Sequence, residues 1–141
     1  MNQLDPILAP IIVLVLWTFF MQLWMAATRL PAMSKARIDP QQAERTADLG
    51  AKLPRQVQWK ADNYNHLMEQ PTIFYATALV WALIGSAGGI NLTLAWVYVG
   101  IRVLHSLVHA TFNKVMVRFT LFAISSLALL VMAINAALVV L

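Results

Sequence analysis

The residues of this chain that could do chemistry recur at helical spacing within an apolar stretch. They stand at steps of four, three and four residues: Tyr98, Arg102, His105 and His109. At about 100° per residue of an α-helix, these side chains fall within about 60° of one another and form one polar stripe. Because a charged side chain at the centre of a bilayer costs about 2.5–3.5 kcal/mol on insertion scales, we expect this stripe to face the protein or a wet cavity.

A second polar stripe precedes a run of aromatic and aliphatic residues. Asp62, His66 and Glu69 follow one another at steps of four and three, with Asn65 beside them. Both stripes lie at the same side of the membrane, one at the start of its predicted helix and the other toward the end of its own. We therefore expect them to face each other, or to face a neighbouring subunit across a water-filled cavity. In the simplest interpretation, Glu69 pairs with Arg102 and clamps two helices together.

Basic residues that follow the first stripe in the sequence enlarge this group of polar side chains. A clamp needs only two residues, whereas nine polar residues are expected at the same depth in the membrane: Asn65, His66, Glu69, Tyr98, Arg102, His105, His109, Lys114 and Arg118. Its ionisable members carry a net positive charge because Arg102, Lys114 and Arg118 outnumber the acids. The group therefore predicts an electropositive pocket that binds an anion.

The same histidines leave a metal or haem site open as an alternative. His105 and His109 are one helical turn apart, and His66 with Glu69 adds an imidazole and a carboxylate. Such a set could ligate zinc, copper or iron, or one histidine could hold a haem. The fixed positive charge of Arg102 one turn away argues against a cation there.

The composition indicates an integral membrane protein. Of the 141 residues, 60% are hydrophobic and 11% are charged, whereas charged residues make up about a quarter of a typical soluble domain. Long apolar runs recur, each near the roughly 20 residues that a helix needs to cross about 30 Å of hydrocarbon. The chain has no cysteine, so any sulfur nucleophile must arrive with a substrate.

The apolar runs predict one all-α membrane domain over residues 1–141, an antiparallel bundle of four transmembrane helices. The predicted spans cover residues 7–27, 62–85, 92–109 and 117–141, and a polar loop over residues 29–61 joins the first two. A single bundle leaves a polar stripe along two helices incompletely covered, so we expect the protein to oligomerise.

Positive charge is concentrated in two of the connections. Seven of the ten Lys and Arg residues lie within residues 29–61, and Lys114 and Arg118 lie in or beside the last connection. By the positive-inside rule these segments face the cytoplasm and both termini lie on the other side, in what we expect to be a bacterial inner membrane. The basic charge thus indicates contact with anionic lipid headgroups and not with nucleic acid.

The chain resembles the MAPEG family, the membrane-associated proteins in eicosanoid and glutathione metabolism. The resemblance covers all four predicted spans and rests on three features. One is the polar stretch that ends in Glu69, two residues before Pro71. The others are the pattern Arg102-x-x-His105 and Arg118, sixteen residues after Arg102. Their spacing is close to that of the microsomal prostaglandin E synthase and microsomal glutathione transferase branch.

The resemblance implies a homotrimer that binds glutathione as cosubstrate and acts on a lipophilic electrophile or lipid hydroperoxide. In such a protein Glu69 accepts from the ammonium group of glutathione, Arg102 pairs with a carboxylate and Lys114 adds a second positive contact. Arg118 matches the arginine near the sulfur, where a cation lowers a thiol pKa that starts near about 8.5. The remaining residues of the implied binding site are Asn65, His66, Tyr98, His105 and His109.

The sequence departs from the family pattern Arg-x-x-x-Asn-x-x-Glu before the second span. Asp62 and His66 stand where that pattern has arginine and asparagine, and His109 and Phe119 replace a tyrosine and a serine of the eicosanoid branch. A different thiol or an acidic lipid is therefore an alternative ligand. A non-catalytic lipid-binding or scaffolding member of the family is the alternative to an enzyme.

Overall fold

The computed structural model describes residues 4–85 and 88–141 and is helical. Its elements are α1 (Leu8–Lys35), the short 3-10 helices η1 (Pro40–Gln42) and η2 (Thr46–Leu49), α2 (Arg55–Leu67), α3 (Pro71–Ile84), α4 (Ile90–Thr111) and α5 (Val115–Val140). Within these residues, four segments are long and apolar enough to cross a membrane, namely α1, α2 together with α3, α4 and α5. The predicted all-α membrane protein with four spans is confirmed.

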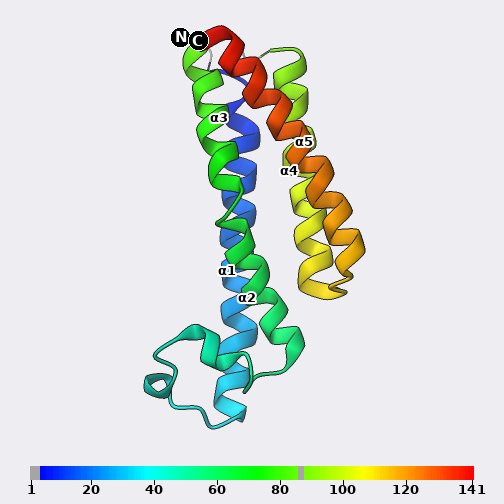
Figure 1. Ribbon diagram of the computed structural model, residues 1–141. Coiled ribbons are helices and arrows are strands. Elements are labelled where there is room, and N and C mark those ends of the chain that lie inside the picture. The colour runs from blue at the N-terminus through cyan, green and yellow to red at the C-terminus, as the bar shows by residue number, and fades with distance from the viewer. Residues whose placement is uncertain (1–3, 86–87) are drawn as a thin grey trace.

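The helices pack as an antiparallel bundle. α4 contacts α1, α2 and α5, while α1 also contacts α2 and α3, and α3 contacts α5. The start of α1 and the end of α5 lie at one end of the bundle, and the segment between α1 and α2 lies at the other (Figure 1). Leu14, Phe74 and Met132 are fully buried in the core, whereas Leu83 and Leu130 are exposed. Such apolar side chains on the outside are expected where the exterior meets lipid.

α1 is longer than the predicted first span. Its 28 residues extend about 42 Å at about 1.5 Å per residue, more than about 30 Å of hydrocarbon. The helix continues through residues 29–35, which the sequence assigns to the polar loop, and α2 likewise begins at Arg55, inside that loop. Met33 near the end of α1 packs with Leu49 and Leu53 in a small second core. This packing gives the last turns of α1 a partner beyond the hydrocarbon.

The second span is broken into α2 and α3 at residues 68–70. Proline has no amide hydrogen and its ring clashes with the carbonyl four residues before it, so Pro71 cannot continue α2. The backbone crosses the break with bonds between residues three apart, from Met68 N to Asn65 O at 3.0 Å and from Glu69 N to His66 O at 3.3 Å. Glu69 therefore stands outside both helices.

Buried polar side chains join the helices inside the bundle. Ser106 Oγ of α4 accepts from Trp17 Nε1 of α1 at 3.0 Å and from Asn63 Nδ2 of α2 at 2.8 Å. Toward the start of α4, Asn135 Nδ2 of α5 donates to Asn91 Oδ1 at 3.0 Å. Lipid offers no hydrogen bonds, so polar groups in the membrane must find partners within the protein. These bonds fix α4 against its three neighbours.

Candidate functional site

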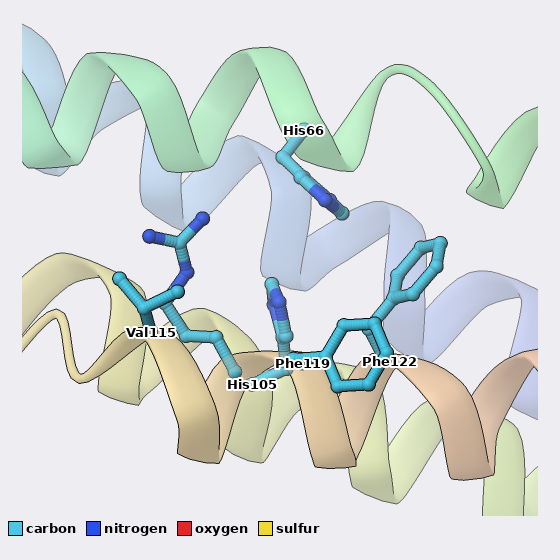
Figure 2. Close-up of a pocket in the computed structure, with 6 residues that line it drawn as sticks. His66, His105, Val115, Phe119 and Phe122 are labelled. Atoms are coloured by element: carbon cyan, nitrogen blue, oxygen red, sulfur yellow. The ribbon is translucent and has the colours of Figure 1, made fainter.

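A cavity of about 210 Å³ lies between α2, α4 and α5. It is lined by one residue of α2, one of α4 and four of α5: His66, His105, Val115, Arg118, Phe119 and Phe122. His66 points from α2 across this space toward His105 and Phe122 (Figure 2). Val115 and Phe119 are 68% and 64% exposed, so the cavity opens on the outer surface of α5.

All three histidines of the chain gather beside this cavity. The ring centroids of His66 and His105 lie 4.9 Å apart. The ring of His109 lies 6.0 Å from that of His66 and 5.9 Å from that of His105. His105 and His109 are buried, whereas His66 is partly exposed. The polar stripes of α2 and α4 thus face each other at these rings.

Arg102 is fully buried in α4 and holds His66. Its Nη2 donates to His66 Nδ1 at 2.8 Å and to the His66 carbonyl at 3.4 Å, and its guanidinium lies 5.8 Å from the centre of the Phe122 ring. Because a guanidinium only donates, Nδ1 accepts, and the proton of the neutral imidazole is on Nε2. The Nε and Nη1 of Arg102 are buried without a hydrogen-bond partner in the described part of the chain.

His66 takes the place that the sequence assigns to Glu69. The hydrogen-bond partner of Arg102 is His66, and the side chain of Glu69 is exposed in the break between α2 and α3. The spacing that aligns Glu69 with His66 holds only along a continuous helix, and Pro71 interrupts that helix. The predicted clamp between Glu69 and Arg102 is therefore replaced by a contact between His66 and Arg102.

Arg118 lines the cavity from the first turn of α5. Its Nη1 donates to Asn113 Oδ1, and its Nε is buried without a partner among the residues described. Asn113 lies between α4 and α5 with a φ of 50°, a conformation that asparagine adopts more readily than most residues. Asn113 thus orients Arg118. Helical spacing did not indicate this role because Asn113 lies between helices, although an asparagine in so short a connection was an available signal.

Six of the nine predicted site residues do not line the cavity, namely Glu69, Arg102 and His109, described above, and three others. Tyr98 is buried, its ring stacks on Phe74 with centroids 4.6 Å apart, and its hydroxyl donates to Gln70 Oε1 at 3.3 Å. Lys114 and Asn65 are exposed. Asn65 lines a different cavity, between α1 and α2, because consecutive residues of a helix point about 100° apart and it cannot share the direction of the next residue.

The chemistry of this arrangement favours an anion over a metal ion. Within residues 4–85 and 88–141, no group of three or more His, Asp or Glu side chains is placed to hold a metal. The Nδ1 of His66 is occupied by Arg102, and a guanidinium repels a cation. No carboxylate is among the described lining residues, whereas Arg118 and the imidazoles offer donors between aromatic walls. Donors in a site from which water is excluded stabilise negative charge more strongly than they do in water.

The comparison with known proteins gave one match. Residues 7–138, from the start of α1 nearly to the end of α5, match the family model described as MAPEG family. All residues that line the cavity lie within the matched range. No curated protein and no solved structure matches the chain.

Proposed function

The chain belongs to the MAPEG family, and on that premise we propose that it is a glutathione-dependent membrane enzyme. Members of the family include glutathione transferases, peroxidases and other enzymes of lipid metabolism. The proposed substrate is a lipophilic electrophile or a lipid hydroperoxide that arrives from the bilayer. The observation that carries the proposal is the cavity between α2, α4 and α5, where a guanidinium and two imidazoles meet without a carboxylate among the described lining residues.

Glutathione fits the charge of this cavity. The family generally uses it, and its carboxylates match the nitrogen atoms that are buried without partners in the described chain, Arg102 Nε and Nη1 and Arg118 Nε. When bound, it supplies the sulfur nucleophile that a chain without cysteine lacks. At the exposed end of the site, Glu69 is proposed to bind the ammonium group of glutathione and Lys114 one of its carboxylates.

Arg118 is the proposed catalytic residue. It brings a positive charge to a cavity whose walls include Phe119 and Phe122, and a cation in such surroundings favours a thiolate over a thiol. Asn113 holds the guanidinium in place. The position of Arg118, sixteen residues after Arg102, is one of the features that support the proposed similarity to the prostaglandin E synthase branch.

Arg102 has a second role in this proposal, because it also orients His66. Its bond to Nδ1 leaves Nε2–H of His66 as a donor. His66 lines the cavity, so this donor is available to a bound anion. Arg102 thereby acts on the ligand through the imidazole as well as through its own positive charge.

We also propose that three copies of the chain assemble, with the basic segments in the cytoplasm. MAPEG proteins are typically oligomeric. The cavity opens on Val115 and Phe119, two large apolar side chains that are exposed in the single chain. A neighbouring subunit would cover them and close the cavity on the side of the lipid.

A calorimetric titration of purified protein with glutathione tests the proposal. We expect wild-type protein to bind glutathione. Arg102→Met replaces the guanidinium by an apolar side chain of similar length and should bind glutathione at least about tenfold more weakly, since hydrogen bonds to charged groups contribute about 1.5–3 kcal/mol. Exposed Arg45 provides the control, and Arg45→Met should bind as wild type does. Absence of binding in the wild type contradicts the proposal. Binding without turnover of chlorodinitrobenzene or of a lipid hydroperoxide favours the non-catalytic alternative.

A further inference from the structure

Two further cavities lie along the boundary between α1 and α2. One measures about 190 Å³ and is lined by residues of α1, α2 and α3 that include Thr18, Tyr64 and Tyr75. The other measures about 510 Å³ and is lined by residues of α1, η2 and α2 that include Arg29 and Asp62. Tyr64 lines both, so they adjoin. Together they form what we name the α1–α2 groove, which shares no lining residue with the cavity at His66.

The α1–α2 groove changes from apolar to charged along α1. The residues of α1 that line it recur on one face: Val15, Thr18, Phe19, Gln22, Met25 and Arg29. From Thr18 to Arg29 the helix rises about 16 Å at about 1.5 Å per residue. This rise matches half of the roughly 30 Å hydrocarbon thickness of a bilayer. A phospholipid with its acyl chain at Thr18 therefore has its headgroup at Arg29.

The charged end of the groove has one unsatisfied donor and one unsatisfied acceptor. Arg29 Nε and Gln58 Oε1 are buried without hydrogen-bond partners in the described part of the chain. Gln58 Nε2 donates to Asp62 Oδ1 at 3.1 Å, so the amide nitrogen is already used. A ligand that satisfies both of these atoms must bring one acceptor and one donor, and an anion paired with a cation makes the strongest such bonds. The same cavity holds a matching pair of charges in Arg29 and Asp62.

The other end of the groove suits an acyl chain. Val15, Phe19 and Met68 are among its lining residues, and the described lining contains no charged side chain. Thr18 Oγ1 donates to Leu14 O at 2.9 Å, so its hydroxyl is satisfied within α1. A soluble zwitterion would leave this apolar end empty, whereas a phospholipid fills both ends.

We propose that the α1–α2 groove binds one phospholipid whose headgroup carries a phosphate and a primary ammonium group, as in phosphatidylethanolamine. The phosphate accepts from Arg29, and the ammonium group donates to Gln58 Oε1 and to the carboxylate of Asp62. The acyl chain lies against Phe19 and Met68. The bound lipid joins α1 to α2 at the boundary of the membrane, independently of the cavity at His66.

Native mass spectrometry of the protein in mild detergent tests this site, without glutathione present. The protein is titrated with phosphatidylethanolamine, phosphatidylcholine and phosphatidylglycerol that carry identical acyl chains. We expect one phosphatidylethanolamine per chain, bound about tenfold more tightly than the other two, as a charge-assisted hydrogen bond would give. The methylated ammonium of phosphatidylcholine cannot donate to Gln58 Oε1, and phosphatidylglycerol has no cation for Asp62.

Two substitutions and their matched controls locate the headgroup. Arg29→Gln should weaken phosphatidylethanolamine binding by about tenfold, and Asp62→Asn should abolish the preference over phosphatidylglycerol. Arg45→Gln and Glu44→Gln change exposed residues of the intervening segment and should bind as wild type does. Equal affinity of wild-type protein for the three lipids overturns the proposal, as does an equal loss in Arg29→Gln and Arg45→Gln. Displacement of the lipid by glycerophosphoethanolamine at equimolar concentration would identify a site for a soluble ligand and would also overturn it.

Discussion

Replacing Arg118 by glutamine tests what the positive charge in the cavity does. Glutamine retains an amide that can donate to Asn113, the partner of the native guanidinium, but it removes the charge. The cavity keeps its shape, and the imidazoles of His66 and His105 remain in its lining. Any loss of activity then reports on electrostatic stabilisation of the bound anion.

The size of this loss follows from the surroundings of Arg118. Two unit charges about 4 Å apart attract by about 4 kcal/mol at an effective dielectric constant of about 20. Arg118 is partly exposed, so solvent screens part of that attraction. A charge-assisted hydrogen bond contributes about 1.5–3 kcal/mol, which corresponds to about 10- to 150-fold in rate. We therefore expect kcat/KM to fall by about two orders of magnitude.

The assay is glutathione-dependent conjugation of chlorodinitrobenzene by protein in proteoliposomes, followed as a function of pH. A cation near the sulfur favours the thiolate, so the bound thiol in the wild type should titrate below its ordinary pKa of about 8.5. Without that cation the thiol pKa rises, and the pH of half-maximal rate should rise with it. The loss in Arg118→Gln is consequently largest at low pH and shrinks as pH increases.

Arg55 provides the matched control, because it is an exposed arginine at the start of α2. Arg55→Gln should keep the wild-type rate and pH profile. If Arg118→Gln still binds glutathione and turns over with wild-type kcat/KM, the positive charge of Arg118 does not contribute to catalysis. A uniform loss at every pH would also contradict the prediction, because it would show that the guanidinium does not act on thiol ionisation.

Further predictions concern stability, helix geometry and metal dependence. Ser106→Ala should lower the free energy of unfolding in detergent by about 1–2 kcal/mol, because it leaves Trp17 Nε1 and Asn63 Nδ2 without their acceptor. Ser125→Ala should cost less because, among the residues described, the Ser125 hydroxyl bonds only within α5, and equal losses would argue against the interhelical role of Ser106. Pro71→Ala should raise helicity measured by circular dichroism, because it restores the amide donor missing at the break; an unchanged spectrum would show that proline does not cause it. Dialysis against a chelator should leave turnover intact, and loss of activity that added zinc restores would support the metal alternative.

The fold could be predicted from the sequence because hydrophobic length is a strong constraint in membranes. Apolar runs near 20 residues long admit few structures other than spanning helices, and the four spans are present. The ends of the helices were harder to predict from the sequence. α1 continues to Lys35 because Met33 packs on a small core outside the main bundle, a tertiary contact that composition does not reveal. The break before Pro71 could have been anticipated from the proline itself.

The candidate site could be predicted only in part, because helical spacing describes one helix at a time. It correctly places His105 and Arg102 on one face of α4, where both are buried. It does not say which residue meets which, and Arg102 bonds to His66 where an ion pair with Glu69 was expected. Helical spacing did not predict that Asn113 orients Arg118, because this role depends on a left-handed backbone conformation in the connection between α4 and α5.

A crystal structure of the protein grown with saturating glutathione would show whether the cavity between α2, α4 and α5 binds this ligand. We expect ligand density in that cavity, with an anionic group at Arg118 and an acceptor at Nε2 of His66. Density for the ligand at another surface, or an unaltered cavity under conditions where calorimetry shows saturation, would contradict this expectation.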